Sequence, residues 1–416
     1  MKVLLSAYAC EPGRGTELGV GWNTAWEIAK YHEVWVLTRP DDGREAIESE
    51  LSRNPNPNLH FVYFTLPVLG SIWRFGSIAF LIHYYFWQVQ AYFVARRLHQ
   101  EINFDVAHHV TFVRHSTPSF LALLPIPFIW GPVGGGESAP NPFWRDFSFR
   151  NRVYEILRSA ARWFGERDPF ARMTARRSTI VRVTTQDTAI RVQEMGAKKI
   201  EVFPEASLTK EEIVRLTQYA STDITVARFI SMGRLLHWKG FHLGLRAFAL
   251  AGLPEAEYWV FGDGPERQRL ESLAAELGIA NQVKFWNRLP RDEVLQKLGS
   301  CTALVHPSLH DSGGWVCLEA MTAARPVICL NLGGPAIQVT DKTGFKVNAS
   351  DPDLAVQGLA AAMVRLANDP ELRLAMGQAG QLRVKEFYNW EIRGQQIVKL
   401  YGDVVRATSL SVGVSS

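Results

Sequence analysis

The chain has 416 residues, a formal net charge of +4 and a hydrophobic fraction of 47%. This length and composition predict two globular domains and exclude a disordered chain. The charge is small, and no zinc-finger, helix-turn-helix or RNA-binding pattern accompanies it, which argues against a nucleic-acid partner.

The first half reads as strands alternating with helices. The sequence MKVLLSAYAC has an apolar run too short for a secretory signal, so we expect a strand and no export. A glycine-rich turn and a helical pattern at residues 22–30 follow it. Further strands are expected at residues 33–38, 59–65, 104–110 and 127–131.

An aromatic segment at residues 75–95 is long enough to span a bilayer. It contains His83, Gln88 and Gln90, and arginines follow it directly. These residues favour a buried helix over a helix lying on a membrane surface, and leave a true span as the least favoured alternative.

Ten arginines crowd the next stretch of the chain: Arg145, Arg150, Arg152, Arg158, Arg162, Arg167, Arg172, Arg176, Arg177 and Arg182. One interpretation is a solvated helix face. The other is a surface that meets anionic lipid headgroups or an acceptor pyrophosphate.

The second half repeats the alternation, which in both halves predicts an α/β fold with a parallel sheet covered on both faces. Its strands are expected at residues 225–232, 257–261, 282–285, 303–306 and 326–330, with helices at 243–251, 266–277, 370–386 and 390–406. The polar residues 208–223 predict a domain boundary near residue 215.

The four cysteines, Cys10, Cys301, Cys317 and Cys329, lack the spacing of zinc or redox motifs. They fit a reducing cytoplasm, where we expect the protein.

Ligands of open parallel sheets bind at the carboxyl ends of the strands. Two glycine-containing loops stand at such ends. The loop at residues 11–17 includes Gly15 and Thr16, and it is either a phosphate-binding turn or an ordinary one. The loop at residues 261–265 includes Gly262 and is a weaker signal on its own.

The loop at residues 231–240 places Arg234 and Lys239 after a strand. Two fixed cations there can bind a diphosphate and neutralise the charge that grows on it as it leaves. The alternative is a pair of solvated loop cations.

The richest segment, residues 306–321, contains two carboxylates, Asp311 and Glu319. We expect Asp311 on the loop and Glu319 in the following helix, where both can accept hydrogen bonds from sugar hydroxyls. A helix starting at Gly313 or Gly314 would point its N-terminus at the same crevice.

Over nearly its whole length the sequence resembles the retaining family 4 glycosyltransferases, which belong to group 1 and have the GT-B fold. The family pattern is two glutamates eight positions apart, then Ala-Met, then Gly-x-Pro-Val. Here Asp311 replaces the first glutamate, Glu319 matches the second, and Ala324 precedes Arg325-Pro326-Val327.

The resemblance implies two Rossmann-like domains facing each other across a cleft. They would comprise an acceptor-side domain at residues 1–215 and a nucleotide-sugar domain at residues 216–385. A helix at residues 386–408 would cross back to the first domain, and residues 409–416 would form a tail that we expect to be disordered.

The resemblance also implies roles for the motif residues. Glu319 would bind the donor ribose, Asp311 the donor sugar, and Arg234 with Lys239 the diphosphate. The backbone of Gly15 and Thr16 would contact the donor phosphate. Gly313 and Gly314 complete the expected donor site, as do Gly262 and Arg288, the latter as a neighbour of the base.

On the acceptor side the family pattern ends a strand in histidines that line the cleft. Here these are His108 and His109, with His109 slightly preferred as the contact to the transferred sugar. Either could instead be a buried core histidine. Gly134, Gly135 and Glu137 would border the acceptor.

The expected reaction transfers a hexose-type sugar from a nucleoside diphosphate sugar with retention, and needs no metal or other cofactor. Asp351 and Asp353 come too late in the chain to form a cation-binding signature. A lipid-linked saccharide at the inner membrane face is the expected acceptor. A hydrolase, a sugar-nucleotide epimerase and a catalytically silent binding protein remain as alternatives, and the oligomeric state stays open.

Overall fold

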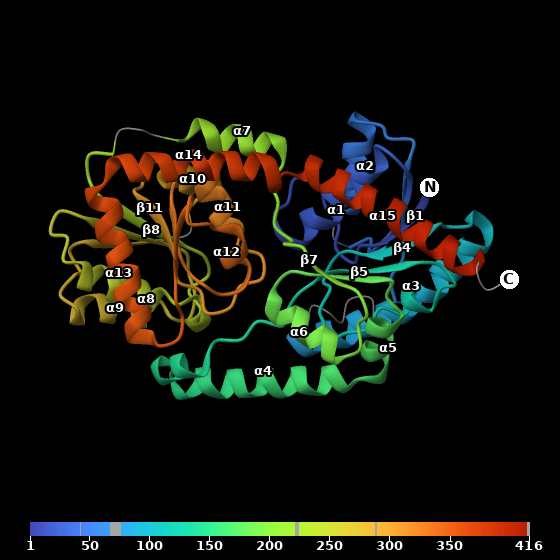
Figure 1. Ribbon diagram of the computed structural model, residues 1–416, viewed down its shortest axis with the longest axis horizontal. Helices are drawn as coiled ribbons and strands as arrows, with labels where there is room; N and C mark the ends of the chain where they lie inside the picture. The colour runs from blue at the N-terminus through green and yellow to red at the C-terminus, as the bar shows by residue number, and fades with distance from the viewer. Residues whose placement is uncertain (42, 67–75, 221–223, 288, 414–416) are drawn as a thin grey trace. The chain divides into compact units, whose positions relative to one another are not determined.

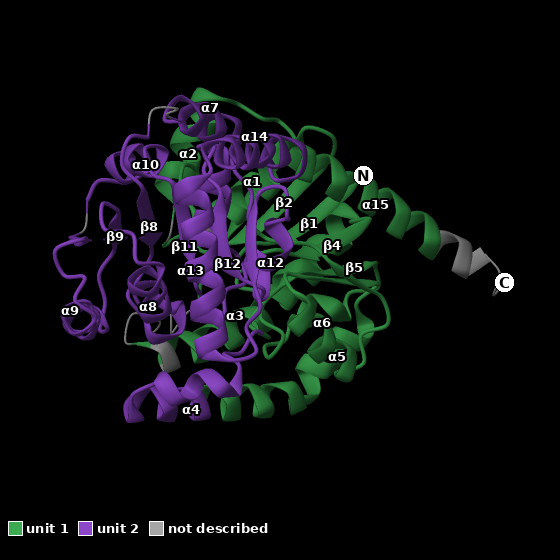
Figure 2. Ribbon diagram, turned by 60° about the vertical axis from the view of Figure 1, so that its left-hand side comes forward, with its two compact units in different colours: residues 1–136, 158–205, 390–416 green, residues 137–157, 206–389 purple. Residues whose placement is uncertain are grey.

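The computed structural model describes residues 1–416 except 42, 67–75, 221–223, 288 and 414–416. The chain forms two compact units (Figure 2). Unit 1 comprises residues 1–136, 158–205 and 390–416, and unit 2 comprises residues 137–157 and 206–389. This division differs from the expected boundary near residue 215. Residues 137–157 join unit 2 because Phe143 and Phe147 lie in its hydrophobic core.

Unit 1 contains a parallel sheet with the strand order β3-β2-β1-β4-β5-β6-β7 (Figure 1). Its strands are β1 (Lys2–Ser6), β2 (Glu33–Thr38), β3 (Leu59–Tyr63), β4 (Val106–His109), β5 (Phe128–Val133), β6 (Ile180–Val183) and β7 (Ile200–Val202). The first five were predicted. Strands β6 and β7 were not, because each is short and carries a charged residue. Arg182 of β6 pairs with Glu201 of β7 across the sheet at 3.0 Å.

The helices of unit 1 are α1 (Thr16–Ala29), α2 (Arg44–Arg53), α3 (Ser77–Ile102), α5 (Pro169–Arg177), α6 (Gln186–Glu194) and α15 (Trp390–Gly413). Helix α4 (Phe149–Arg167) starts in unit 2 and ends in unit 1. Alternate residues of β1 lie in two different hydrophobic cores. Val3 and Leu5 pack with α1 and α15, whereas Leu4 packs with α3.

The last helix differs from the expectation. We expected a helix at residues 390–406 within a crossing segment at 386–408, followed by a disordered tail; α15 begins at Trp390 as predicted but continues to Gly413. Its buried residues Ile397, Tyr401 and Val404 share a core with α1. These residues recur about one helical turn apart, so they form one apolar face of α15 that packs against the core of unit 1.

The described residues 77–95 of the aromatic segment lie in α3, where Gln90 is half-buried. His83 and Gln88 are fully buried beside Trp87. The Tyr8 hydroxyl lies 2.8 Å from Nδ1 of His83. Leu81, Ile82, Phe86 and Phe93 of the same helix are exposed, so α3 is buried only in part. Among the described residues, no helix combines the length and apolarity that crossing a bilayer requires.

Unit 2 contains a second parallel sheet, with the order β10-β9-β8-β11-β12-β13 (Figure 1). Its strands are β8 (Arg228–Met232), β9 (Glu257–Phe261), β10 (Val283–Trp286), β11 (Ala303–His306), β12 (Val327–Leu330) and β13 (Gly344–Val347). Only β13 was not predicted, because this strand has four residues and its short apolar pattern is interrupted by the charged Lys346.

The helices of unit 2, besides the start of α4, are α7 (Lys210–Gln218), α8 (Phe241–Ala251), α9 (Arg267–Glu276), α10 (Arg291–Gly299), α11 (Trp315–Thr322), α12 (Gly333–Gln338), α13 (Pro352–Asn368) and α14 (Pro370–Phe387). Helix α7 lies in the polar stretch that predicted a domain boundary near residue 215. It begins with a capping box in which the Thr209 and Glu212 side chains satisfy backbone amides.

Two cores cover the faces of this sheet. Phe229 of β8 faces the core with α8 and α13, and its neighbour Ile230 faces the core with α7, α10, α11 and α14. Cys301, Cys317 and Cys329 belong to the second core, and all four cysteines are free and buried. They act as small apolar residues.

Candidate functional site

The strand order of unit 2 reverses between β8 and β11. In open parallel sheets such a reversal opens a crevice at the carboxyl ends of the two strands, where ligands bind. The loop after β8 carries Lys239 at the end of a short 3₁₀ helix (His237–Lys239), and the loop after β11 carries Asp311. Both predicted residues therefore lie at the reversal point.

Asp311 is the centre of what we call the strand-end cluster, formed by Lys239, His306 and Asp311. Its Oδ2 accepts a hydrogen bond of 2.5 Å from Nζ of Lys239 and lies 3.1 Å from Nε2 of His306. Burial alone would raise the pKa of Asp311, but the Lys239 ammonium and His306 hold it far below its ordinary value. Asp311 is therefore an anion at any physiological pH.

The other oxygen of Asp311, Oδ1, accepts hydrogen bonds of 3.2 Å from the backbone amides of both Gly313 and Gly314. Helix α11 begins directly afterwards at Trp315. Gly314 has φ 60°, and a Cβ atom there would lie 2.6 Å from the Gln338 side chain. Glycine is thus required at this helix start by both conformation and space.

Glu319 lies within α11 and is buried. One carboxylate oxygen pairs with Arg291 at the start of α10, while Oε2 has no hydrogen-bond partner. Burial raises the pKa of Glu319 to about 7, although Arg291 acts in the opposite direction. An unpaired buried carboxylate oxygen is costly unless a ligand completes it. Arg291 was not among the predicted residues.

The remaining predicted residues of unit 2 lie around the same strand ends. Arg234 is exposed, and its side chain forms no ion pair within the described part of the chain. Gly262, at the end of β9, has φ 140°, and a Cβ there would lie 1.9 Å from the Gly233 carbonyl oxygen. The predicted residue Arg288 lies outside the described residues.

Ala324 stands where the resemblance predicts glycine, and its φ of 55° falls in the left-handed region. The Ala324 amide bonds to the Met321 carbonyl, and the Arg325 amide to the Ala320 carbonyl. Together these bonds form a Schellman motif, whose left-handed position is usually glycine. The backbone thus has the conformation that the family glycine would adopt.

In unit 1 the strand order reverses between β1 and β4. Gly15 precedes α1 at this end of the sheet as its N-cap, and Thr16 is the first residue of the helix, with a side chain outside the described part. Glu17 follows, and it was not predicted. Its carboxylate accepts a hydrogen bond of 2.8 Å from the Phe112 amide, and burial raises its pKa to about 7.

His108 and His109 point to opposite faces of β4 and are both buried. His108 bonds to the Tyr401 hydroxyl and to the Gly131 carbonyl oxygen, each at 2.7 Å. His109 Nε2 lies 3.1 Å from the Tyr84 hydroxyl. Burial lowers the pKa of each histidine to about 3, so both are neutral near pH 7. For His108 the contacts favour a core histidine. For His109 a contact with the sugar stays a prediction.

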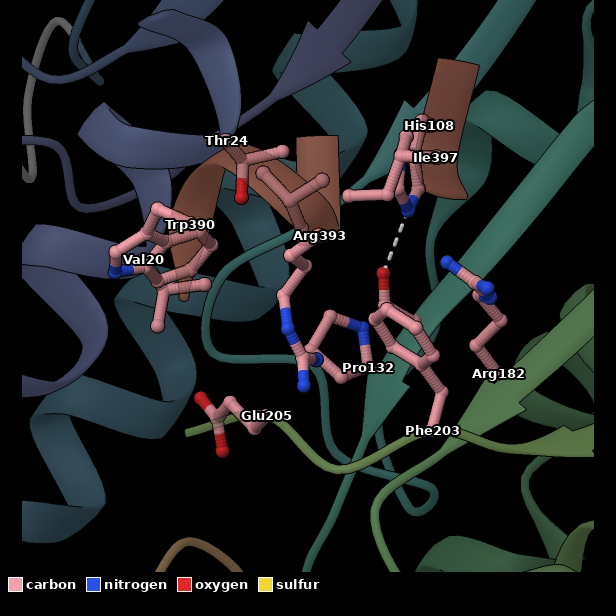
Figure 3. A pocket seen from close by; sticks show the side chains of 12 residues that line it. Val20, Thr24, His108, Pro132, Arg182, Phe203, Glu205, Trp390, Arg393 and Ile397 are labelled. Atoms are coloured by element: carbon pink, nitrogen blue, oxygen red, sulfur yellow. Dashed lines mark hydrogen bonds between the residues drawn. The ribbon is translucent and has the colours of Figure 1, made fainter. Parts of the chain in front are cut away.

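Figure 3 shows the cavity beside His108, with the dashed line marking its bond to Gly131. The cavity is lined by residues of unit 1 alone, among them Arg182, Phe203 and Arg393. With a volume of about 10 Å³, it has room for about one water molecule and none for a sugar.

The glycine segment after β5 builds a polar cluster that sequence reading missed. The Gly134 carbonyl accepts from the His115 amide, and Gly135 has φ 86° beside the His115 ring. His115 Nε2 lies 3.1 Å from Glu166, and Arg191 bonds to the same oxygen of Glu166 at 2.5 Å. Burial alone would raise the pKa of Glu166, but hydrogen bonds from His115 and Arg191 lower it to about 2.

Glu137, predicted to border the acceptor, is buried and begins the segment that belongs to unit 2. Asp351 and Asp353 lie at the start of α13. Asp351 caps the helix, and Asp353 pairs with Arg145 and Arg246. Within the described ranges, no group of three or more His, Cys, Asp or Glu side chains is arranged to hold a metal ion.

Residues 222–383 match the family model of the glycosyl transferases group 1. A lipopolysaccharide core biosynthesis glycosyltransferase, LpsD, of Rhizobium meliloti is 33% identical over 48% of this chain and 57% of its own length. A D-inositol 3-phosphate glycosyltransferase of Corynebacterium urealyticum is 33% identical over 41% of each chain. The chain thus spans about half the length of these curated relatives.

Solved structures match over nearly the whole chain. A sucrose-phosphate synthase from Thermosynechococcus elongatus has a TM-score of 0.64 with 18% identity, covering 98% of this chain and 99% of its own. Anabaena HepE, solved in complex with UDP, has a TM-score of 0.62 with 18% identity, covering 97% and 100%. At these identities the likeness shows the fold.

The two parallel sheets with their helices therefore form a GT-B fold. The resemblance to group 1 glycosyltransferases of this type is confirmed, with the family match confined to unit 2. The strand-end cluster and Glu319 lie inside the matched residues.

Proposed function

We propose that the chain transfers a hexose-type sugar from a nucleoside diphosphate sugar to a saccharide or lipid-linked saccharide, with retention of configuration. The observation that carries the proposal is the strand-end cluster. Lys239 and Asp311 meet at the reversal point of the unit 2 sheet, within the residues that match group 1 glycosyltransferases.

In this proposal Lys239 and Arg234 bind the diphosphate, and the unpaired Oε2 of Glu319 accepts a hydrogen bond from a ribose hydroxyl. Asp311 accepts hydrogen bonds from the transferred sugar. The bond between the anomeric carbon and the diphosphate breaks, and the diphosphate leaves with the electron pair. The acceptor oxygen attacks the same face, and its proton passes to an oxygen of the departing diphosphate. The two cations stabilise the departing charge without a metal.

A lipid-linked acceptor and a position at the inner membrane face form the second part of the proposal. The relatives include a lipopolysaccharide core glycosyltransferase and a mannosyltransferase that acts on a phosphatidylinositol monomannoside. These are functions of the relatives, and they suggest polysaccharide or glycolipid synthesis for this chain.

The test is a thermal-shift panel of nucleoside diphosphates and nucleotide sugars. A ligand that binds only the native state raises the unfolding midpoint by mass action. We expect one diphosphate series to stabilise the wild type and to have no effect on Glu319→Ala or Arg234→Ala. Lys385→Ala and Glu386→Ala, which change exposed charges on α14, should respond like wild type. No shift with any ligand would refute the donor site.

A catalytically silent binding protein is the second candidate, because Asp311 and Ala324 both depart from the family pattern. The same panel followed by a nucleotide-release assay with saccharide and lipid-linked acceptors separates the two. Binding without release, across all acceptors, would favour the silent protein.

A further inference from the structure

Helix α4 is inverted relative to an ordinary surface helix, because its apolar side faces outward. Its exposed large side chains lie at the spacing of one helical face and reach 84% exposure at Phe149 and 68% at Phe164. They are Phe149, Val153, Tyr154, Ile156, Leu157, Trp163 and Phe164. We call the surface formed by these residues the α4 outer face.

The polar side of α4 faces the protein. Glu155 is buried and lies 2.9 Å from Nε2 of His237. Asn151 donates to Glu266 at 2.9 Å, and Glu166 bonds to His115 and Arg191. Rotating the helix to hide its apolar side would break these buried polar contacts and leave charges unpaired, which is costly. The buried polar contacts therefore fix the rotation of α4 and keep its outer face exposed.

Single exposed apolar side chains are common on soluble proteins, but a contiguous stripe of them marks an interaction surface. Figure 1 shows α4 as one unbroken helix, and the exposed Ala160 and Ala161 lie between Leu157 and Trp163 in its sequence. The question is what covers it.

The charges around the stripe favour an anionic bilayer. Both acidic residues of α4, Glu155 and Glu166, face inward and are paired. The exposed charged residues of the helix are all arginines: Arg150, Arg152 and Arg167. Arg167 stacks over the Trp163 ring at 3.8 Å. Apolar and aromatic side chains flanked by arginines are the composition of helices that lie in a membrane interface.

A second copy of the chain fits the same surface less well. Antiparallel pairing of two α4 helices would set Arg150 of one against Arg167 of the other, and parallel pairing would set each arginine against itself. Neither arrangement offers an exposed acidic partner on the helix, so like charges would repel.

We propose that the α4 outer face is a docking surface for a bilayer containing anionic lipids, with the apolar side chains in the interface and the arginines at the headgroups. The inference rests on the membrane part of the proposed function and is independent of the donor chemistry.

The experiment measures co-sedimentation with vesicles of phosphatidylcholine alone or mixed with phosphatidylglycerol. We expect the wild type to bind the mixed vesicles at low salt and high salt to release it, because salt screens the arginines. The variant Ile156→Ser/Leu157→Ser/Phe164→Ser should lose binding at least tenfold. The matched control Leu354→Ser/Leu374→Ser/Leu382→Ser, which changes exposed leucines on α13 and α14, should bind as wild type.

Two further measurements keep the test decisive. Arg150→Glu/Arg167→Glu should also lose binding without any change of apolar area. In wild type, brominated lipid should quench tryptophan fluorescence, and Trp163→Phe should reduce that quenching. The thermal-shift response to nucleoside diphosphates should persist in every variant, which separates failure of docking from failure of the donor site.

The proposal is overturned if the wild type ignores the mixed vesicles at low salt, or if both α4 variants bind as well as the wild type. It is also overturned if the wild type is a dimer that becomes monomeric in the serine variant, because a second copy would then cover the face.

Discussion

Lys239 and Asp311 form an ion pair of 2.5 Å although 72 residues separate them in the chain. The cation proposed to bind a diphosphate is thus paired with the carboxylate proposed to bind the sugar. A bound diphosphate has to compete with Asp311 for Lys239.

Replacing Asp311 with asparagine should therefore have opposite effects on two ligands. Nucleoside diphosphate should bind roughly fivefold more tightly, because a competing ion pair worth about 1 kcal/mol is removed. The additional affinity given by the attached sugar should fall. Titration calorimetry measures both. Asp263→Asn makes the same charge change in the neighbouring loop after β9 and should alter neither, and equal losses for both ligands would contradict the competition.

The raised pKa of Glu319 predicts a pH-dependent donor affinity. The carboxylate accepts ribose hydroxyls best when ionised, and burial raises its pKa in the free protein to about 7. Nucleoside diphosphate affinity should rise roughly tenfold between about pH 6 and about pH 8, with proton release on binding below the midpoint. Glu319→Gln should remove this rise while keeping the ligand's own titration. An identical pH dependence of the affinity in wild type and Glu319→Gln would contradict the assignment of Glu319 to the ribose.

The lowered pKa of Glu166 predicts that this residue stabilises the folded protein in a pH-dependent way. Its folded pKa of about 2 lies below its ordinary value of 4.5, so the ionised form is stabilised in the native state. The contribution is complete above pH 4.5 and is lost as the pH falls toward 2. Glu166→Gln should destabilise unit 1 by about 1 kcal/mol at pH 7, because solvent screens the ion pairs of this partly exposed carboxylate, and the difference should shrink in acid. Urea unfolding measures this, with the exposed Glu194→Gln as the control.

Ala324→Gly should stabilise the protein. A left-handed conformation costs a non-glycine residue about 1 kcal/mol, and φ at Ala324 is 55°. The gain, reduced by the greater freedom of glycine in the unfolded chain, should be about 0.5 kcal/mol. The neighbouring Ala323 has φ −78°, so Ala323→Gly should instead destabilise. Thermal unfolding of the two variants gives the signs.

The sequence predicted most of the two sheets because buried parallel strands are nearly continuous apolar runs. Strands β2, β9 and β11 match the expected ranges residue for residue. Strands β6, β7 and β13 were not predicted, because each is short and contains a charged residue. Helix α7 was not predicted, although Thr209 and Glu212 have capping-box spacing, because a short polar segment can equally be a loop.

The sequence indicated candidate site residues but not the contacts between them. Lys239 and Asp311 were predicted from loops that follow strands, and Glu319 from the helix after Asp311 together with the family pattern. Arg291 lies on α10, and His115 lies between strands, so neither position signalled a role. Their contacts with Glu319 and Glu166 depend on tertiary packing, which brings together residues 28 and 51 positions apart.

The hydrogen bond between His108 and Tyr401 joins residues 293 positions apart. It has a consequence for the order in which the chain can fold during its synthesis. All segments of unit 2 have left the ribosome once residue 389 emerges, whereas unit 1 still lacks α15. We expect unit 2 to fold first, while Nδ1 of His108 lacks its Tyr401 partner until α15 has been synthesised.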